Sequence, residues 1–152
     1  MKKVILPITM SLLILSITGC SLVPPSTLPT STPVPSIPPS GYEPQPDDAK
    51  LTRDQVFLDV ENSSVLIRES LPAQVSVMLN GNLSDPCHQL RVVVTPANSL
   101  KEIKLEVYSV FDPNMACITV IKPFTATIPL GNYAGGHFTV YANGQLVGEL
   151  DI

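Results

Sequence analysis

The stretch Gln74-Val75-Ser76-Val77-Met78-Leu79 shows the period on which the folded part of this chain is built. Val75, Val77 and Leu79 occupy alternate positions, and apolar residues at every second position predict a β-strand with one buried face. No window of the sequence carries a convincing period of an amphipathic helix. The alternation recurs later in the chain, at residues 103–111, 124–130 and 138–140.

Shorter apolar runs bring the predicted number of strands to seven or eight. Turn signals between the runs, such as Asn80-Gly81 and Asp112-Pro113-Asn114, indicate short strands with tight connections. This pattern predicts an all-β chain folded as an antiparallel β-sandwich. Pro123 and Pro129 fall beside or within one strand pattern, so we expect that strand to lie at a sheet edge or to contain a bulge. The additional runs are residues 55–60, 65–68 and 90–95.

The register of the last predicted hairpin depends on the loop around Asn143-Gly144. A two-residue turn pairs Phe138 with Glu149, whereas a three-residue loop over residues 142–144 pairs Phe138 with Gly148. We expect the three-residue loop, because it directs Glu149 outward and leaves room beside Gly148 for the phenyl ring.

The N-terminus carries the features of an export signal. Lys2 and Lys3 supply positive charge, residues 4–17 form an apolar run of about fourteen residues, and Thr18-Gly19 are small residues suited to a signal-peptidase pocket. A spanning helix needs roughly twenty apolar residues. We therefore expect the apolar run to be removed and not retained in the membrane.

The end of this signal, Ile17-Thr18-Gly19-Cys20, resembles the lipobox of bacterial lipoproteins, whose cysteine thiol is alkylated with a diacylglyceryl group before cleavage. The resemblance implies that residues 1–19 are a signal peptide and that Cys20 is the lipidated first residue of the mature chain. Two acyl chains anchor stably, since each buried methylene contributes about 0.8 kcal/mol. We expect attachment to the cell membrane through the lipid on Cys20, on the extracytoplasmic face. The alternative is a chance cysteine after an ordinary cleavage site.

Proline dominates the segment that follows the anchor. Residues 24–46 hold nine of the sixteen prolines, interleaved with Ser and Thr. Proline lacks the N–H that helices and sheets require and fixes φ, so we expect a disordered, extended spacer of polyproline II character. The predicted organisation is a signal peptide at 1–19, a lipidated Pro-rich linker at 20–49 and a β-sandwich at 50–152. A ligand for a partner's aromatic groove is the competing interpretation of the Pro-rich segment.

The remaining cysteines form an even pair once Cys20 carries lipid. Cys87 and Cys117 then lie in a secreted domain, where oxidised pairing is allowed, and we expect a disulfide between them. Closing a loop of about thirty residues stabilises a domain by roughly 3.5 kcal/mol on the chain-entropy estimate. The alternatives are a metal site or a reactive thiol, although neither cysteine has a second one at C-x-x-C spacing.

The mature chain is acidic. Without Lys2 and Lys3 it has seven basic residues against thirteen acidic ones, and so a formal net charge of −6. A chain of this sign repels phosphate backbones, so we expect no nucleic-acid partner. The acidic residues are scattered, which is typical of a solvated surface and not of a docking patch.

Candidate catalytic residues are few. His88 and His137 are the only histidines, and either could serve as a base or a metal ligand. We expect both to be exposed strand-end residues, because no carboxylate or second ligand lies at a telling spacing. No serine occurs in Gly-x-Ser-x-Gly or in Ser-x-x-Lys. We therefore predict no catalytic residue, no metal and no cofactor, and a protein that is not an enzyme.

The aromatic residues disfavour a sugar-binding protein. The chain has no Trp, and the strand patterns assign Phe57, Phe124 and Phe138 to the core, whereas sugars stack on exposed rings. The remaining candidates for surface contacts are Tyr108, Tyr133 and Tyr141.

The turns, core positions and cysteine pair after residue 65 are similar to those of uncharacterised bacterial envelope lipoproteins with one immunoglobulin-like domain. The residues that carry the resemblance include Cys87, Cys117 and Gly136-His137-Phe138-Thr139-Val140. The resemblance implies an immunoglobulin-like β-sandwich and the disulfide, and it implies no activity.

The leading hypothesis is a non-enzymatic, lipid-anchored envelope protein that displays a β-sandwich binding or structural module on a Pro-rich stalk. The expected partner is an extracellular protein or an envelope polymer, and the expected state is a monomer. A proteinase inhibitor is the first alternative, with residues 80–86 and 112–116 as its candidate loops beside the cysteines. An enzyme of unknown class is the least supported alternative.

Overall fold

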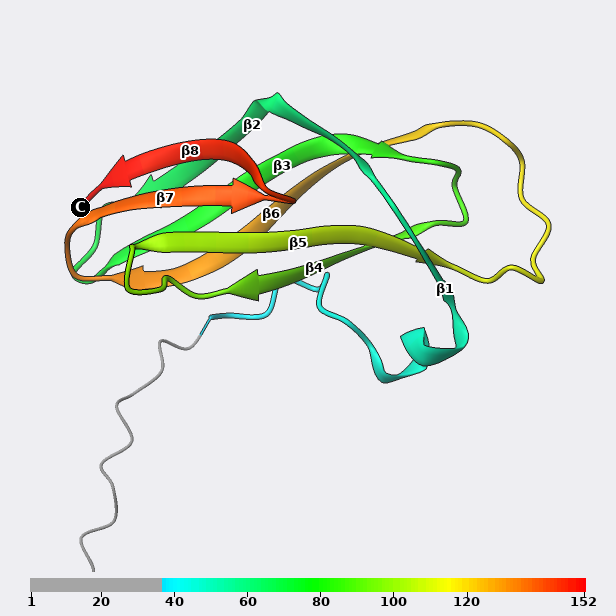
Figure 1. The fold of residues 1–152 in the computed structure, drawn as a ribbon, viewed down its shortest axis with the longest axis horizontal. Coiled ribbons are helices and arrows are strands. Elements are labelled where there is room, and N and C mark those ends of the chain that lie inside the picture. The colour runs from blue at the N-terminus through cyan, green and yellow to red at the C-terminus, as the bar shows by residue number, and fades with distance from the viewer. Residues whose placement is uncertain (1–36) are drawn as a thin grey trace, which may run out of the picture. The chain divides into compact units, whose positions relative to one another are not determined.

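Alternate side chains along the strands point into the core, as the period of two predicts. The computed structural model describes residues 37–152, and Figure 1 shows them as an all-β arrangement of eight strands. Cys20, the predicted signal peptide and the first part of the predicted linker lie outside the described residues. No helix within residues 37–152 has the length and apolar character needed to cross a membrane. The elements are η1 (Pro46–Lys50), β1 (Thr52–Asp54), β2 (Phe57–Arg68), β3 (Ala73–Leu83), β4 (Gln89–Thr95), β5 (Glu102–Phe111), β6 (Lys122–Tyr133), β7 (His137–Ala142) and β8 (Gln145–Asp151).

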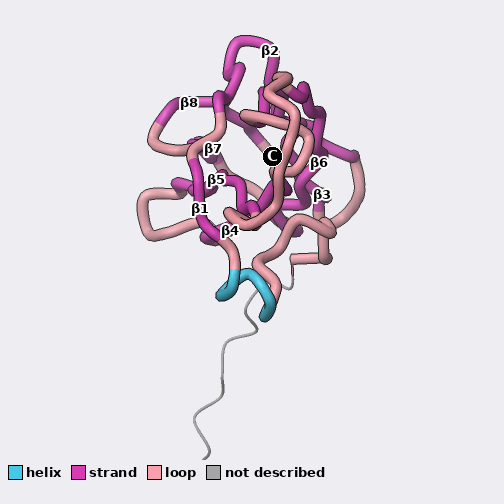
Figure 2. Tube along the Cα trace, turned by 90° about the vertical axis from the view of Figure 1, so that its right-hand side faces the viewer, coloured by secondary structure: helices cyan, strands magenta, loops and turns pink. Residues whose placement is uncertain are grey.

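The strands form two sheets in two layers (Figure 2), which confirms the predicted β-sandwich. One sheet has three strands in the order β2–β3–β6, so that β3 is bonded on both edges. The other sheet has five strands and is centred on β5, which pairs with β4 along one edge and with β1 and β7 along the other. β8 extends this sheet beyond β7. The strand pairs are antiparallel, as predicted, with the exception of β5–β7, which is parallel.

The core lies between the two sheets and consists of the inward side chains of their strands. Side chains with almost no exposed surface come from β3, β5, β6 and β7, so both sheets contribute. Burying one aliphatic side chain of this size stabilises a fold by about 1.5–3 kcal/mol. The largest of the fully buried apolar side chains are Leu79, Ile103, Ile128, Leu130, Val77 and Val140.

The prolines of β6 lie where the sequence predicts an edge or a bulge, and both are present. β6 pairs only with β3, so it is an edge strand, which tolerates residues without an N–H. Pro129 lies opposite Ser76, next to a register shift between Val75 and Ser76. The prediction for this strand is therefore confirmed.

The side chain of Asn143 completes the edge of β5 where its two partner strands leave a gap. β7 pairs with β5 as far as Leu105, and β1 pairs with it from Ser109 onward. Between them, Asn143 Oδ1 accepts a hydrogen bond from the Val107 N–H, and Asn143 Nδ2 donates one to the Val107 carbonyl, both at 2.8 Å. The carboxamide thus takes the place of a peptide unit, and both backbone groups of Val107 keep a partner.

Asn143 also lies in the turn of the last hairpin, for which the predicted three-residue loop is wrong. Asn143 and Gly144 have φ values of 49° and 80° and form a two-residue turn. The register shifts at a bulge within β8, so Phe138 lies opposite the buried Leu150 and not opposite Gly148. A bulge adds one residue inside the ladder, which a count of loop residues does not detect.

Residues 37–50 pack against the sandwich, so the folded part starts before the predicted boundary at residue 50. The Tyr42 carbonyl accepts a hydrogen bond from the Val92 N–H at 2.7 Å, which covers part of the free edge of β4. Asp48 of η1 accepts two hydrogen bonds from Arg91, from Nε at 2.7 Å and from Nη2 at 2.8 Å. These contacts, which the proline content does not reveal, make the end of the Pro-rich segment part of the folded domain and not a disordered linker.

Replacing Asn143 tests its role in the β5 edge. We expect Asn143→Gly to keep the turn, because glycine adopts positive φ, and to lower the free energy of unfolding by about 2 kcal/mol through the two lost hydrogen bonds. Urea unfolding at equilibrium measures the difference. Asn114→Gly, in an exposed loop, controls for the flexibility of glycine; equal midpoints for the two variants would contradict the assignment.

Replacing Asp48 tests the contact between η1 and β4. Hydrogen bonds from Arg91 lower the pKa of Asp48 below its ordinary value. A lowered pKa in the folded state stabilises the protein above the unfolded-state pKa of about 3.9, and this contribution is lost as the pH falls through the folded-state pKa. We therefore expect Asp48→Asn to lower the urea midpoint at neutral pH and to converge on the wild type in acid.

The control for this variant is Asp47→Asn, because within residues 37–152 Asp47 pairs only with Lys50 and both side chains are exposed. It makes the same change of charge and should leave the midpoint almost unaltered. A difference between Asp48→Asn and the wild type that stays constant from neutral pH into acid would show that the ion pair does not stabilise the fold.

Candidate functional site

The outer face of the β2–β3–β6 sheet is almost free of charge. Because β3 is bonded on both edges, the outward side chains of the three strands align in rows, and one row consists of Asp59, Asn80 and Thr125. Asp59 and Arg68 carry the only charges among the paired outward residues of these strands. The other paired outward residues are Phe57, Ser64, Leu66, Gln74, Ser76, Met78, Asn82, Pro123, Thr127, Pro129 and Asn132.

A wide bulge in β2 separates it from β3 at one end of this face. Asp59 lies opposite Asn80 and Ser64 lies opposite Met78, so four residues of β2 face a single residue of β3. The Ser63 hydroxyl, which is buried, accepts a hydrogen bond from the Asn80 N–H at 3.0 Å and donates one to the Asp59 carbonyl at 2.7 Å. The bulge therefore opens the sheet without leaving the Asn80 N–H unpaired.

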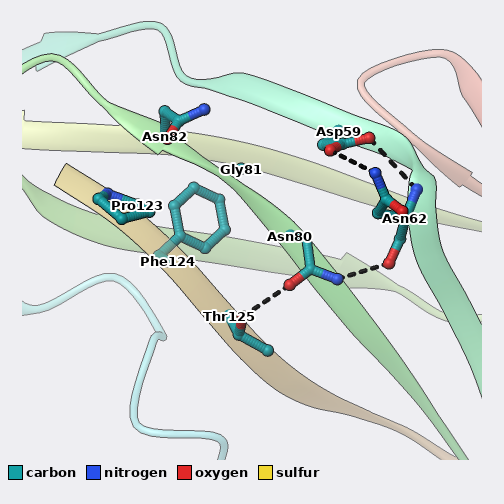
Figure 3. Close-up of a pocket in the computed structure, with 8 residues that line it drawn as sticks. All are labelled: Asp59, Asn62, Asn80, Gly81, Asn82, Pro123, Phe124 and Thr125. Carbon is teal, nitrogen blue, oxygen red and sulfur yellow. Dashed lines mark hydrogen bonds between the residues drawn. The ribbon is translucent and has the colours of Figure 1, made fainter. Parts of the chain in front are cut away.

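The bulge borders an open cleft of about 620 Å³, shown in Figure 3. Its polar side chains are connected by hydrogen bonds. Asp59 accepts from the backbone N–H and from the Nδ2 of Asn62, at 3.2 and 2.8 Å. Asn80 Nδ2 donates to the Asn62 carbonyl, and the Thr125 hydroxyl donates to Asn80 Oδ1 at 2.6 Å. The cleft residues are Asp59, Asn62, Asn80, Gly81, Asn82, Pro123, Phe124 and Thr125.

Gly81 permits the close packing of this cleft. Asn80-Gly81 was predicted as a turn signal, but both residues lie within β3. A Cβ on Gly81 would lie 2.3 Å from the Phe57 carbonyl oxygen and 2.8 Å from the Phe124 ring. Glycine is therefore required at this position by the close approach of β2 and of the ring, and not by a turn.

Phe57 differs from the prediction of a core position. It is 69% exposed, because the inward positions of its segment belong to Val56, Leu58 and Val60. Phe124 packs against the core, as predicted, although it is only partly buried and also lines the cleft. The alternation of Val56, Leu58 and Val60 was the sequence signal that assigns Phe57 outward.

Tyr133 also differs from the prediction of a surface contact. Its side chain is buried, and its hydroxyl donates a hydrogen bond to the Leu130 carbonyl at 3.1 Å. Burial raises the pKa of Tyr133 above its ordinary value. The ring packs against Phe138, with the ring centres 4.6 Å apart. Tyr133 is therefore a core residue and has no role in a surface site.

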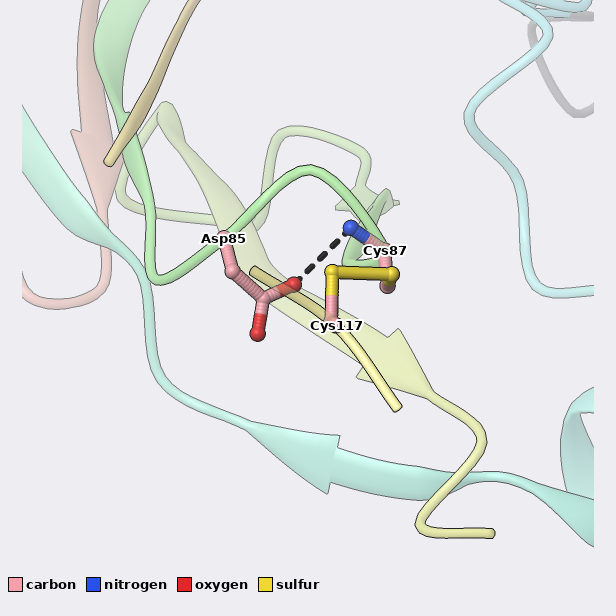
Figure 4. Close-up of side chains that lie close together, drawn as sticks. All are labelled: Asp85, Cys87 and Cys117. Carbon is pink, nitrogen blue, oxygen red and sulfur yellow. Dashed lines mark hydrogen bonds between the residues drawn. A yellow bond between two sulfur atoms is a disulfide. The ribbon is translucent and has the colours of Figure 1, made fainter. Parts of the chain in front are cut away.

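The structure joins Cys87 to Cys117 by a disulfide, with the Cα atoms 6.1 Å apart. The bond connects the loop before β4 to the loop between β5 and β6. Asp85 lies beside it, and the three side chains have their ligand atoms within 4.8 Å of one another (Figure 4). A sulfur in a disulfide is not a thiolate, so this cluster does not provide a metal-binding set. Asp85 instead accepts a hydrogen bond from the Cys87 N–H at 2.8 Å.

His88 was predicted to be exposed, and it is buried. Its side chain is 5% exposed and stacks on Phe111, with the ring centres 4.5 Å apart. Nδ1 lies 2.8 Å from an Asp85 carboxylate oxygen, and this hydrogen bond is the main cause that lowers the pKa of Asp85. Nε2 lies 3.3 Å from an Asp54 oxygen, in an orientation that makes no hydrogen bond.

The surroundings of His88 do not form a nucleophile and base pair within the described residues. The nearby Ser84 hydroxyl donates to Asp54 at 3.2 Å and not to the imidazole. Both ring nitrogens of His88 face carboxylates, and a carboxylate orients an imidazole but offers no hydroxyl for it to activate. The contacts of His88 link β1, the disulfide loop and the end of β5. His88 therefore has a structural role.

His137 lies on the exposed surface at the other end of the five-stranded sheet. His88 stacks on Phe111, the last residue of β5. His137 lies near the start of β5, because Thr139 pairs with Glu102, the first residue of that strand. His137 Nδ1 lies 2.8 Å from Asp151, and this contact raises the pKa of His137. The structure therefore does not bring the two histidines together.

The comparisons with known proteins match the β-sandwich and assign no activity. A family model described as the ORF11 beta-sandwich domain matches residues 77–152. The chain is also 31% identical over 85 residues to an uncharacterized 10.2 kDa protein in the HgiCIIM 5′ region of Herpetosiphon aurantiacus, a match that covers 55% of this chain and 89% of the relative. No solved structure matches significantly. The chain belongs to the ORF11 beta-sandwich domain family.

Proposed function

We propose that this protein is a non-enzymatic lipoprotein of the cell envelope, which binds an envelope component through the outer face of the β2–β3–β6 sheet. The observation that supports the proposal is the polar character of this outer face. Its outward residues are mostly amides, hydroxyls and prolines, and it holds a cleft with an ordered network of polar side chains. A fixed polar network binds without first having to be ordered, which is typical of binding surfaces.

The lipid anchor in this proposal rests on the sequence Ile17-Thr18-Gly19-Cys20. With two acyl chains on Cys20, the mature chain stays on the membrane, and the linker separates the sandwich from it. Residues 37–50 pack on the sandwich, so the separating segment in this proposal is residues 21–36.

The position of the cleft suits a display role. Ile37, the first described residue, lies near Gly131 toward the end of β6, where a Cβ on that glycine would be 3.7 Å from the Ile37 side chain. The cleft residues Pro123 and Thr125 lie at the start of the same strand. The chain therefore enters the folded domain near one end of β6 and the cleft lies at the other, which favours a cleft that faces away from the membrane.

Mutation of Cys20 tests the anchor. In a bacterial host, we expect the wild-type protein to fractionate with membranes and its mass to correspond to a chain that starts at Cys20 and carries acyl groups. Cys20→Ala should carry no acyl groups, because a single residue holds the lipid. The variant should then be found as soluble protein or as an uncleaved precursor. A control with Ser21→Ala keeps the cysteine and should remain on the membrane. An unmodified Cys20 in the wild type would contradict the proposal.

A second candidate function is inhibition of a proteinase, and one loop favours it. Residues 112–121, between β5 and β6, lie on the yellow segment of Figure 1 and are held by the disulfide at Cys117. The predicted candidate loop at residues 80–86 is not available as a whole, because β3 extends to Leu83. An exposed, extended segment can pair with the cleft of a proteinase. The exposed apolar side chains of this loop are Met115, Ile118, Val120 and Ile121.

A proteinase panel tests this candidate. If this second function is correct, the purified protein inhibits at least one serine or cysteine proteinase stoichiometrically, and Ile118→Gly weakens the inhibition by removing an exposed side chain that would enter the enzyme. Leu100→Gly, an exposed apolar residue outside the loop, is the matched control. The absence of inhibition across the panel, or equal inhibition by both variants, would exclude this function.

A further inference from the structure

The cleft on the outer face has the chemistry of a site for a neutral, hydroxyl-rich ligand. Its side chains offer carboxamide groups from Asn62, Asn80 and Asn82, a hydroxyl from Thr125 and one carboxylate from Asp59. A carboxamide both donates and accepts, which allows it to pair with adjacent hydroxyl groups that also do both. Among the described residues, Asp59 is the only charged one that lines the cleft, and both of its oxygens already accept hydrogen bonds from Asn62.

The polar groups of the cleft are held in place and still have bonding capacity. Asn80 uses one Nδ2 hydrogen for the Asn62 carbonyl and one Oδ1 lone pair for the Thr125 hydroxyl. One donor and one acceptor position of the same carboxamide remain. Asn82 makes no side-chain hydrogen bond within residues 37–152, so its whole carboxamide is free to bind. These groups point to a ligand that carries several hydroxyls in a row.

One phenyl ring lines the cleft, and a second lies beside a cleft residue. Phe124 lines the cleft, and Phe57 lies opposite Asn82, one row beyond Asn80, with 69% of its surface exposed. The face of an aromatic ring is electron-rich and attracts the C–H groups of a sugar ring. An exposed phenyl ring contributes little to folding, so its position beside a polar cleft favours a role in binding.

The remaining outer face continues the cleft along β3 and β6. Ser76, Thr127 and Gln74 follow Asn80 and Thr125 in successive rows, and no charge interrupts them before Arg68. A chain of several sugar units could therefore lie along the rows. The core of a typical protein interface is rich in large apolar side chains, whereas these rows hold five hydroxyl or amide side chains beside Leu66, Met78 and Pro129. Arg68 is the only basic residue among the paired outward residues of these strands, and it lies in the row farthest from the cleft, which disfavours an anionic polymer.

We infer that the cleft and the rows that continue it bind a neutral glycan chain. Asn80, Asn82 and Thr125 pair with its hydroxyls, and Phe57 and Phe124 contact the apolar faces of its sugar rings. The inference rests on the proposed function, because it names the envelope component that the sheet binds.

Calorimetric titration of the purified full-length protein in detergent tests this inference. The probes are chitohexaose, cellohexaose, laminarihexaose and maltohexaose, with an oligogalacturonate of the same length as the charged comparison. We expect saturable binding of at least one neutral hexasaccharide with a Kd of about 1 mM or tighter, and no binding of the oligogalacturonate. Failure of all four neutral probes to bind, or equal binding of the charged one, would overturn the inference.

Two variants locate the binding. Phe57→Ser and Asn82→Asp should each weaken it about tenfold or more, because the first removes a ring and the second adds a charge and loses donors. Phe57 is exposed and the Asn82 side chain makes no hydrogen bond in the described part of the chain, so both variants should fold with an unchanged thermal midpoint. Leu100→Ser and Gln145→Glu make matched changes elsewhere on the exposed surface and should bind like the wild type.

The results separate this inference from the proposed function. If Phe57→Ser and Asn82→Asp bind the hexasaccharide like the wild type, the cleft is not the glycan site. If Cys20 of the wild type carries no acyl groups while hexasaccharide binding is intact, the anchor is wrong and the glycan site stands. If Cys20 of the wild type is acylated and no neutral glycan binds, the anchor stands and only the glycan site is lost.

Discussion

The pairing of β3 on both of its edges is the constraint from which the rest of the structure follows. Hydrogen bonds to β2 and β6 fix β3, so its side chains point alternately into the core and to the outer face of the sheet. Val75, Val77 and Leu79 enter the core, and Ser76, Met78 and Asn80 are held on the outer face. The same pairing aligns the neighbouring strands with these rows. The core and the candidate binding surface are therefore two sides of one strand, and a register slip of one residue would destroy both.

The places where the pairing fails are as informative as the regular parts. β2 leaves β3 at its bulge, and β1 and β7 leave a gap along β5. In each case a side chain replaces the missing backbone partner: the Ser63 hydroxyl at the bulge and the Asn143 carboxamide at the gap. Such replacements let a sheet bend without leaving a buried N–H unpaired. At the bulge the result is a cleft, because strands that separate expose the side chains between them.

The β-sandwich could be predicted from the sequence, whereas the parallel pairing of β5 with β7, the register of the last hairpin and the site could not. Alternation at Val75, Val77 and Leu79 is a local signal, and so is a proline within an edge strand, and both predictions were confirmed. The cleft depends on a bulge in β2, which no local pattern marks. The strand pattern was interpreted as placing Phe57 in the core, although Val56, Leu58 and Val60 fill the inward positions of this segment. His88 is buried because a distant strand supplies Phe111, and contacts between distant segments are not visible in spacing.

Photo-crosslinking in intact cells tests most directly whether the outer face of the β2–β3–β6 sheet meets the envelope. A photoreactive residue at Thr127 reports on that face, and the same residue at Lys104 reports on the exposed surface of the five-stranded sheet. We expect a crosslinked product that carries envelope glycan from position 127 and none from position 104. A glycan product from position 104 alone, or from neither position, would contradict it.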